Sequence, residues 1–309
     1  MTRSLDTRWK QLGITIAGRN GQGNQLDQLS FPSSIYIDDN DQTIYIADSG
    51  NARIVKWKAN SKTGEVVAGG NGIGDRINQL NNPAAVINDR EENSLIIADT
   101  GNRRVIRRSC RPNSDEQMII PNIDCRSLAM HKDGSLYVLD YKKNEVRRWK
   151  RGETNGTVVA GGNGKGRQLD QLDTPRGIVV DDDHTLYISD GGNHRVMKWL
   201  EDGKEGIVVA GGNGQGNGES QLSSPDGLFV DQFRQIYVAD AGNNRVMRWC
   251  DGAKEGIMLM TGGNQQRRGA DRLNRPVGLS LDRLGNLYVV DCKNHRIQKF
   301  IIDYQQMFE

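Results

Sequence analysis

Short runs of apolar and β-branched residues recur along the chain and are separated by turn-forming residues. In one representative unit the runs cover 175–181, 185–190, 195–199 and 207–210. Runs of this length predict β-strands, and no segment shows the apolar spacing of an α-helix over ten residues. The unit is therefore predicted to be four antiparallel strands.

Two motifs show that this unit is repeated. A glycine-rich segment of sixteen residues that ends in proline, here called a joint, occurs five times, and Asp-x-Gly-Asn-x-Arg-[Ile/Val] marks the turn after the second run. The joints end at Pro32, Pro83, Pro175, Pro225 and Pro276. The motif begins at Asp48, Asp99, Asp140, Asp190, Asp240 and Asp291, with spacings of 51, 41, 50, 50 and 51 residues. A fixed period of this length is typical of a repeat architecture with six units.

Six units of four strands predict an all-β fold, a six-bladed β-propeller in one domain over 1–309. The last unit lacks a fourth strand, while 12–18 resembles an isolated fourth strand at the N-terminus. We therefore expect 12–18 to complete the last blade and remove an open sheet edge. The six blades are expected at about 31–69, 82–121, 124–161, 174–211, 224–262 and 275–302.

The pattern [Leu/Ile]-Tyr-[Ile/Val]-x-Asp-x-Gly-Asn-x-Arg-[Val/Ile] resembles NHL repeats over about residues 12–302. The resemblance implies a six-bladed propeller. It does not choose one function, because NHL-type propellers include protein-binding and RNA-binding modules as well as amidating-lyase-like enzymes with histidine ligands and an arginine around a central metal.

The repeated residues are interpreted as structural. The motif aspartate is expected to accept backbone N–H groups, the glycine and asparagine to adopt left-handed conformations, and the arginine to clamp an aspartate bidentately. An aromatic slot is expected to pack between blades, and the basic residue before it to lie on a solvated outer strand. The aromatic slot holds Trp57, Trp149, Trp199, Trp249 and Phe300, and the basic one holds Lys56, Arg107, Arg148, Lys198, Arg248 and Lys299.

A glycine-rich joint also invites interpretation as an anion-binding loop. No joint has the required phosphate-loop register, no Gly-Lys-[Ser/Thr] follows, and no helix is available. The joints are instead expected to form bends between blades, with a leucine in each that packs between neighbouring sheets. These leucines are Leu29, Leu80, Leu172, Leu222 and Leu273.

Composition restricts the class of protein only broadly. The net charge is +2, no run of about 18 apolar residues exists, and the N-terminus lacks the apolar core of a signal peptide. We expect a soluble monomer, cytoplasmic by default, with an extracellular location left open. Of the four cysteines, Cys110 and Cys125 flank one short connection and could pair, whereas scattered buried thiols are the simpler interpretation.

The sequence predicts no cofactor, no metal site and no catalytic residue. His194 and His295 occupy the variable position before the motif arginine, while His131 and His184 fall in predicted hairpin turns. No His-x-x-x-His, HExxH or GxSxG pattern occurs. The acidic clusters at 38–41 and 181–183 are interpreted as solvated turns. A central metal site built from one residue of each blade would escape a search by spacing.

The third unit departs most from the others. Its joint is replaced by 109–125, and Glu145 stands in place of the motif arginine. Between 103 and 151 there are 13 Lys or Arg against 6 Asp or Glu, a local charge of +7. The shorter joint is expected to leave a notch in one face, and this face is expected to carry the basic side chains. The predicted partner-binding residues are Arg19, Arg103, Arg126, Lys142, Lys143 and Lys165.

The leading hypothesis is a non-enzymatic NHL propeller that binds a partner, protein first and RNA second, through the loop face around blades two and three. No membrane partner is expected. The alternative is a metal-dependent lyase or hydrolase with its site at the central opening. A scaffold selected or designed for its repeat alone is a third hypothesis, because the copies are so alike.

Overall fold

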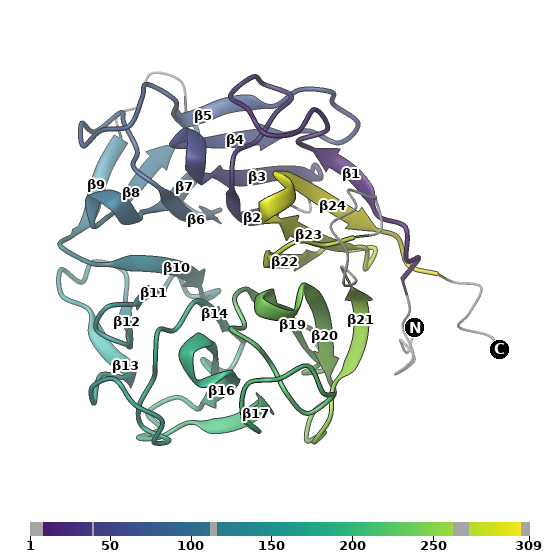
Figure 1. Ribbon diagram of the computed structural model, residues 1–309. Helices are drawn as coiled ribbons and strands as arrows, with labels where there is room; N and C mark the ends of the chain where they lie inside the picture. Colours follow the sequence, from purple (N-terminus) through teal and green to yellow (C-terminus); the bar gives the residue numbers. More distant parts are fainter. Residues whose placement is uncertain (1–8, 39, 112–115, 262–271, 304–309) are drawn as a thin grey trace.

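The computed structural model describes residues 9–38, 40–111, 116–261 and 272–303. Six four-stranded antiparallel sheets are arranged as blades around a central opening (Figure 1). The predicted all-β six-bladed propeller is confirmed. Asp39, part of 109–125 and most of the fifth joint were included in the sequence predictions but lie outside the described residues.

The strands of each blade run outward from the opening in chain order, except that the outer strand of blade six is the N-terminal β1. Blades one to three contain β2 (Pro32–Asp38), β3 (Thr43–Asp48), β4 (Arg53–Trp57), β5 (Glu65–Gly69), β6 (Pro83–Asp89), β7 (Ser94–Asp99), β8 (Arg104–Ser109), β9 (Glu116–Pro121), β10 (Cys125–Met130), β11 (Leu136–Asp140), β12 (Glu145–Trp149) and β13 (Thr157–Gly161). Blades four to six contain β14 (Gly177–Val180), β15 (Leu186–Asp190), β16 (Arg195–Trp199), β17 (Ile207–Gly211), β18 (Leu228–Val230), β19 (Ile236–Asp240), β20 (Arg245–Trp249), β21 (Ile257–Thr261), β22 (Pro276–Leu281), β23 (Leu287–Asp291) and β24 (Arg296–Phe300), together with β1 (Ile14–Ala17).

The N-terminal strand closes the ring. β1 pairs antiparallel with β24 as the outer strand of the last blade, with Ile14 opposite Lys299. Trp9 extends this contact, because it forms a bridge with Ile302 and its indole N–H donates to the Gly285 carbonyl at 2.9 Å. The first and last described segments of the chain are thus held in one sheet, and the predicted closure of the last blade by the N-terminal strand is confirmed.

The motif aspartate and arginine tie five of the six blades, all except blade three, to the joint that precedes each of them. In blade one, Oδ1 of Asp48 accepts the Ser30 N–H at 2.7 Å, and Oδ2 accepts Nε–H of Arg53 at 2.8 Å. The arginine makes one bond to the carboxylate, not the predicted two. Its terminal nitrogens donate instead to carbonyls of the joint, those of Asn24, Gln25 and Gln28.

The turn after the second strand is a short 3-10 helix in five blades, and the left-handed residue is not the one predicted. Glycine and asparagine lie inside this helix, and the variable residue after them takes positive φ, as Ala52 does at 51°. The glycine is needed for space, since a Cβ on Gly50 would lie 2.7 Å from the Ser30 carbonyl oxygen. The five turns are η1 (Ser49–Asn51), η2 (Thr100–Asn102), η3 (Gly191–Asn193), η4 (Ala241–Asn243) and η5 (Cys292–Asn294).

The contacts between the turns and the joints also account for the replacement of the motif arginine by Glu145 in blade three. The motif arginine of every other blade donates to carbonyls of the preceding joint, as Arg104 does to Asp75 and Arg76. Blade three is preceded by 109–125, which is not a glycine-rich joint. Glu145 is buried there and pairs with Arg147 at 2.6 Å.

Apolar side chains fill the spaces between neighbouring blades. The joint leucines are all buried, at 0–4 % exposure, so their predicted packing role is confirmed. The aromatic slot is buried as well, and Trp57 belongs to a cluster that joins blades six and one. The basic ring differs from the prediction at Arg248, which is only 2 % exposed, while Lys299 lies 5.0 Å from the ring centre of Tyr288.

All four cysteines are free thiols, so the pairing considered for Cys110 and Cys125 does not form. Cys125 is buried, and burial raises its pKa to about 12. Among the described residues, no helix has the length and apolar character required to cross a bilayer.

Candidate functional site

The first strand of each blade lines the central opening. The turns after the second strands contact the joints, so both lie on one face, which we call the joint face. The turns between first and second strands lie on the other face, which we call the hairpin face. At the mouth on the joint face, each blade contributes the residue after the joint proline, or after Cys125 in blade three. These six residues are Ser33, Ala84, Arg126, Arg176, Asp226 and Val277.

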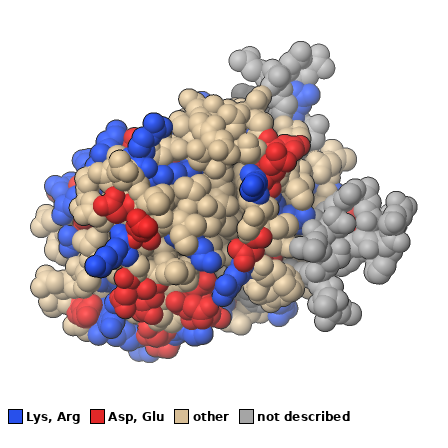
Figure 2. Space-filling model, turned by 90° about the horizontal axis from the view of Figure 1, so that it is seen from below, with Lys and Arg blue, Asp and Glu red and all other residues tan. Residues whose placement is uncertain are grey.

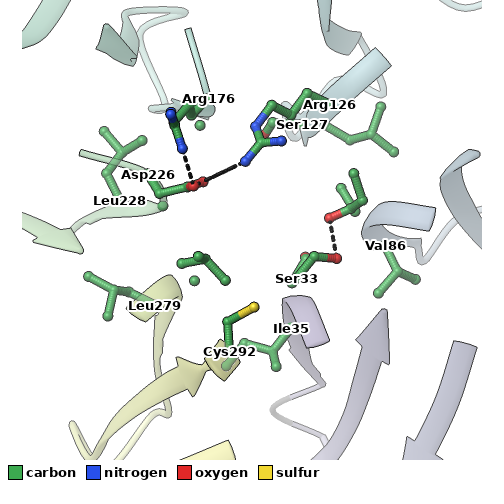
Figure 3. A pocket seen from close by; sticks show the side chains of 18 of the residues that line it. Ser33, Ile35, Val86, Arg126, Ser127, Arg176, Asp226, Leu228, Leu279 and Cys292 are labelled. Atoms are coloured by element: carbon green, nitrogen blue, oxygen red, sulfur yellow. Dashed lines mark hydrogen bonds and ion pairs between the residues drawn. The ribbon is translucent and has the colours of Figure 1, made fainter. Parts of the chain in front are cut away.

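A cavity of about 370 Å³ occupies the opening at this mouth (Figure 3). Its polar centre is Asp226, which is buried and accepts hydrogen bonds from two arginines. Nη2 of Arg126 lies 3.0 Å from Oδ2, and Nη1 of Arg176 lies 3.2 Å from the same oxygen. The Nε atoms of both arginines are buried and have no hydrogen-bond partner among the described residues. Each arginine bonds Asp226 through one terminal nitrogen, so the other one, Nη1 of Arg126 or Nη2 of Arg176, retains donor capacity toward the cavity.

The wall of the cavity is positively charged. Besides the three charged residues already named, Arg275 and Lys293 line it, so four cations face one carboxylate and the sum is +3. Charges that surround a concave, partly buried site act through a lower dielectric than charges on an open surface. The mouth therefore favours an anion.

Below the charged mouth the lining is apolar. Each blade contributes one aliphatic side chain, two residues beyond its mouth position. These are Ile35, Val86, Leu128, Ile178, Leu228 and Leu279. The thiol of Cys292 also faces the cavity (Figure 3), and burial raises its pKa to about 11. A ligand that enters would meet cations first and an apolar floor behind them.

The residues that line this cavity do not fit a catalytic metal. Among the described lining residues there is one carboxylate, that of Asp226, and no histidine. Divalent cations in proteins need several oxygen, nitrogen or sulfur ligands, and both oxygens of Asp226 already accept guanidinium N–H groups. Neither Ser33 nor Cys292 is activated as a nucleophile. The Ser33 hydroxyl donates to backbone carbonyls, and burial raises the pKa of the Cys292 thiol, which disfavours the thiolate.

Of the predicted partner-binding residues, Arg126 lines the cavity. Arg103 and Lys142 meet at a neighbouring point, where both pair with Asp124, at 3.1 and 3.0 Å. Burial raises the pKa of Asp124, but hydrogen bonds and charge from Lys142 and Arg103 outweigh burial, so the pKa is lowered. These two cations join blades two and three on the joint face, but Asp124 cancels part of their charge.

The other predicted residues lie farther along the joint face. Lys143 follows Lys142 in the turn of blade three and makes no ion pair with the described residues. Lys165 lies in the joint between blades three and four and pairs with Asp173 at 3.2 Å. Arg19 lies in the first joint, and its Nε–H donates to the Thr15 carbonyl.

The basic segment between 103 and 151 is not a free positive surface. Ten of its 13 Lys and Arg residues are in ion pairs, several with acids outside the segment. Arg151, for example, contacts Glu91, Glu92 and Asp89 of blade two. On the side of the ring seen in Figure 2, basic and acidic side chains are likewise intermixed.

The predicted notch beside blade three is found in a different place. A cavity of about 440 Å³ lies between blades two and three. Its lining includes Glu92, Gly134 and Gly152, which belong to hairpin turns, so it opens toward the hairpin face and the rim of the ring. The basic side chains of Arg103 and Lys142, which were expected on the same face as the notch, lie instead on the joint face.

Sequence reasoning did not select Arg176, Asp226, Arg275 or Lys293. One signal was present: the residue after the joint proline changes from blade to blade while the residues around it repeat. These six positions meet at one mouth. Their different side chains make this mouth asymmetric, although the blades around it are similar.

Comparisons with known proteins agree with this architecture. The model of the SMP-30/Gluconolactonase/LRE-like region family matches residues 31–258, and that of the NHL repeat matches residues 273–300. No curated protein sequence matches the chain.

Solved structures of other proteins share the fold, and three of them illustrate the likeness. An auxiliary nutrient binding protein from Bacteroides ovatus has a TM-score of 0.69 at 13 % identity, covering 96 % of this chain and 78 % of its own. A gluconolactonase from Xanthomonas campestris has a TM-score of 0.62 at 13 % identity, covering 98 % and 99 %. Selenomethionine-substituted virginiamycin B lyase from Staphylococcus aureus has a TM-score of 0.60 at 12 % identity, covering 91 % and 98 %.

Identities this low establish a common fold and leave the activity open. The family match, by contrast, spans most of the chain and agrees with the six blades and their NHL-type turns. The protein therefore belongs to the SMP-30/gluconolactonase/LRE-like family of β-propellers.

Proposed function

We propose that the protein is a binding module without catalytic activity that captures an acidic protein segment on its joint face. One carboxylate of that segment enters the mouth of the central opening. The observation that carries this proposal is the +3 charge of the cavity wall, where Arg126 and Arg176 each keep one terminal nitrogen that does not bond Asp226.

The chemistry of the mouth matches a carboxylate. Guanidinium groups bind carboxylates through charge-assisted hydrogen bonds, which are stronger than hydrogen bonds between neutral groups. Asp226 already occupies this site from within the chain, so the geometry required for an external carboxylate is present. The cavity, at about 370 Å³, has room for an acidic side chain and the apolar carbons next to its carboxylate.

A protein partner is favoured over RNA by the position of the aromatic residues. Single-stranded RNA is bound largely by stacking of bases on exposed aromatic side chains. Trp57, Trp199 and Trp249 are at most 2 % exposed and pack between blades. Phe31 is the large aromatic side chain at the cavity mouth, and its ring already contacts His295 edge to face.

The class of partner is tested by fluorescence anisotropy with three labelled probes: a glutamate-rich peptide, a lysine-rich peptide of equal length and a uridine oligonucleotide. The proposal expects the glutamate-rich peptide to bind more tightly than the oligonucleotide at physiological salt, and the lysine-rich peptide not to bind. Tighter binding of the oligonucleotide would replace the protein partner with RNA. Equal binding of both peptides would refute an anion-selective mouth.

A second candidate is a hydrolase or lyase that uses the same cavity, because gluconolactonase and virginiamycin B lyase share the fold over nearly the whole chain. The lining residues argue against it, as described above. Purified protein is assayed for hydrolysis of gluconolactone with and without added divalent cations. Turnover that is lost in an Asp226→Asn variant would make this the leading function.

A further inference from the structure

Two histidines from adjacent blades meet on the hairpin face, away from the proposed binding site. His131 follows β10 in blade three, and Asp133 lies in the turn after it. His184 lies in the corresponding turn of blade four. The two imidazole ring centres are 3.6 Å apart.

The carboxylate of Asp133 lies against both rings. Its Oδ1 is 2.8 Å from Nδ1 of His131, and its Oδ2 is 3.6 Å from Nε2 of His184. One nitrogen of each ring and one carboxylate oxygen all lie within 4.8 Å of one another. Zn²⁺ holds nitrogen and oxygen ligands at about 2.0–2.2 Å, so small side-chain rotations would bring these three atoms onto one ion.

The far nitrogen of each histidine already has an oxygen partner. Nε2 of His131 is 3.3 Å from the carbonyl oxygen of Asp182, and Nδ1 of His184 is 2.9 Å from the hydroxyl of Tyr137. Histidines that bind metals usually donate their second N–H to such an oxygen, which fixes the ring orientation. The arrangement therefore leaves Nδ1 of His131 and Nε2 of His184 directed toward Asp133.

The contact between His131 and Asp133 places a ring nitrogen against a carboxylate oxygen. A carbonyl oxygen can only accept, so the tautomer that donates to Asp182 carries its proton on Nε2 of His131. In the neutral ring Nδ1 is then an acceptor, and it accepts the backbone N–H of Asp133 at 3.3 Å. In this tautomer the lone pair of Nδ1 faces Oδ1 of Asp133 at 2.8 Å, an arrangement that suits two ligands of one metal ion.

Comparison among the blades shows that His131 is a substitution within the repeat. Blades four, five and six have aspartate at this position, and its Oδ1 accepts two backbone N–H groups of the turn, as Asp181 does from Asp183 and Thr185. In blade three the turn is closed by two side chains instead, with Asp133 Oδ1 accepting the Ser135 N–H at 2.8 Å. Oδ1 of Asp133, the oxygen that lies nearest His131, thus also accepts the backbone hydrogen bond that closes the turn.

We propose that His131, Asp133 and His184 form a binding site for a divalent transition-metal ion of the Zn²⁺ class, which links the turns of blades three and four. Two imidazoles and a carboxylate favour Zn²⁺ and its neighbours over Mg²⁺ or Ca²⁺, which prefer oxygen ligands alone. Asp133 is 46 % exposed, so an ion reaches the site from solvent and water completes its coordination. Blade three lacks the arginine that ties other blades to a joint, and the metal supplies a different tie.

The test is a titration of the full chain with ZnCl₂, after treatment with EDTA and dialysis, followed by isothermal calorimetry. We expect one equivalent to bind, and the Tm to rise by roughly 4 °C at a hundredfold excess over Kd. Co²⁺ in place of Zn²⁺ should give visible absorption bands of a nitrogen- and oxygen-ligated ion.

Variants connect the binding to these residues. His184→Gln and Asp133→Asn should each weaken Zn²⁺ binding by roughly 100-fold or more, and Tyr137→Phe by about 10-fold through loss of the second hydrogen bond. His194→Asn is the matched control, because asparagine occupies the same variable position in blades three and five. It should bind Zn²⁺ as the parent does.

The proposal is overturned if the parent protein binds no stoichiometric Zn²⁺, or if His184→Gln and Asp133→Asn both bind it unchanged. Binding of the glutamate-rich peptide is measured on the same samples and should not respond to EDTA, so the two proposals succeed or fail separately.

Discussion

Arg126 and Asp226 are 100 residues apart in the sequence, and their side chains meet at the mouth of the central opening, where Nη2 of the arginine lies 3.0 Å from Oδ2 of the aspartate (Figure 3). Arg176 donates to the same oxygen from the intervening blade. The three residues occupy equivalent positions of blades three, four and five. Asp226 is therefore an internal competitor for any acidic ligand of the two arginines.

This relationship predicts that Asp226→Asn increases affinity for an acidic ligand. The substitution keeps the shape of the side chain but removes the competing charge, so the cavity wall changes from +3 to +4. We expect the Kd of the glutamate-rich peptide to fall by roughly 10-fold, with a steeper dependence on salt. Asp183→Asn on the hairpin face is the control. An unchanged or higher Kd in Asp226→Asn would contradict the assignment.

The link between motif and joint predicts a large loss of stability for Arg245→Gln. Arg245 is buried, pairs with Asp240 at 2.7 Å and donates to three joint carbonyls, so its removal leaves a buried carboxylate unpaired. The free energy of unfolding in urea should fall by about 3–5 kcal/mol. Arg234→Gln breaks an exposed pair with Asp183 and should cost less than about 1 kcal/mol. Similar losses for both variants would show that the buried pair has no special role.

The ring closure predicts that Trp9 stabilises the whole propeller. Trp9 is 4 % exposed, and its ring meets Tyr237 edge to face at 5.9 Å between centres. Trp9→Ala should lower the free energy of unfolding by about 3–5 kcal/mol. Leu12→Ala, at a side chain that is 70 % exposed, should change it by less than about 0.5 kcal/mol. A small effect of Trp9→Ala on thermal unfolding would mean that closure depends on β1 alone.

Asp124 predicts a specific dependence of stability on pH. Its pKa in the folded state is lowered, since hydrogen bonds and charge from Lys142 and Arg103 outweigh the effect of burial. A lowered folded pKa gives a stabilisation that is present above the unfolded pKa of about 3.9 and is lost as pH falls through the folded value. The parent protein should exceed Asp124→Asn in free energy of unfolding near neutral pH, and the difference should shrink below about pH 4. A difference that grows on acidification would reverse the sign of this argument.

The repeat made much of the fold predictable. Six spaced aspartates gave the blade number, and the defects at the two ends of the chain predicted that β1 joins β24. The buried positions of Leu29 and Trp57 followed from their recurrence at one place in every unit. A residue that recurs at one place in every unit has the same structural role in each blade. These roles could therefore be inferred without knowing which residues are close in space.

The candidate site was harder to predict from the sequence. Charge counting selected the segment around Arg103 and Lys142, but it does not show that Asp124 neutralises them or that distant acids pair with their neighbours. The closeness of His131 and His184 arises from the lateral packing of two blades and has no sequence spacing to signal it. Such contacts are set by ring closure, which the pattern within one unit does not describe.

The most direct test of the proposed function compares two double variants in binding of the glutamate-rich peptide at physiological salt. Arg126→Gln with Arg176→Gln removes the donors at the cavity mouth, and Lys142→Gln with Lys143→Gln removes two cations from the neighbouring surface of blade three. We predict that the first raises Kd by at least roughly 10-fold and the second by less than about 3-fold, with urea unfolding confirming that both remain folded. Equal Kd values for the first variant and the parent protein would contradict the central claim.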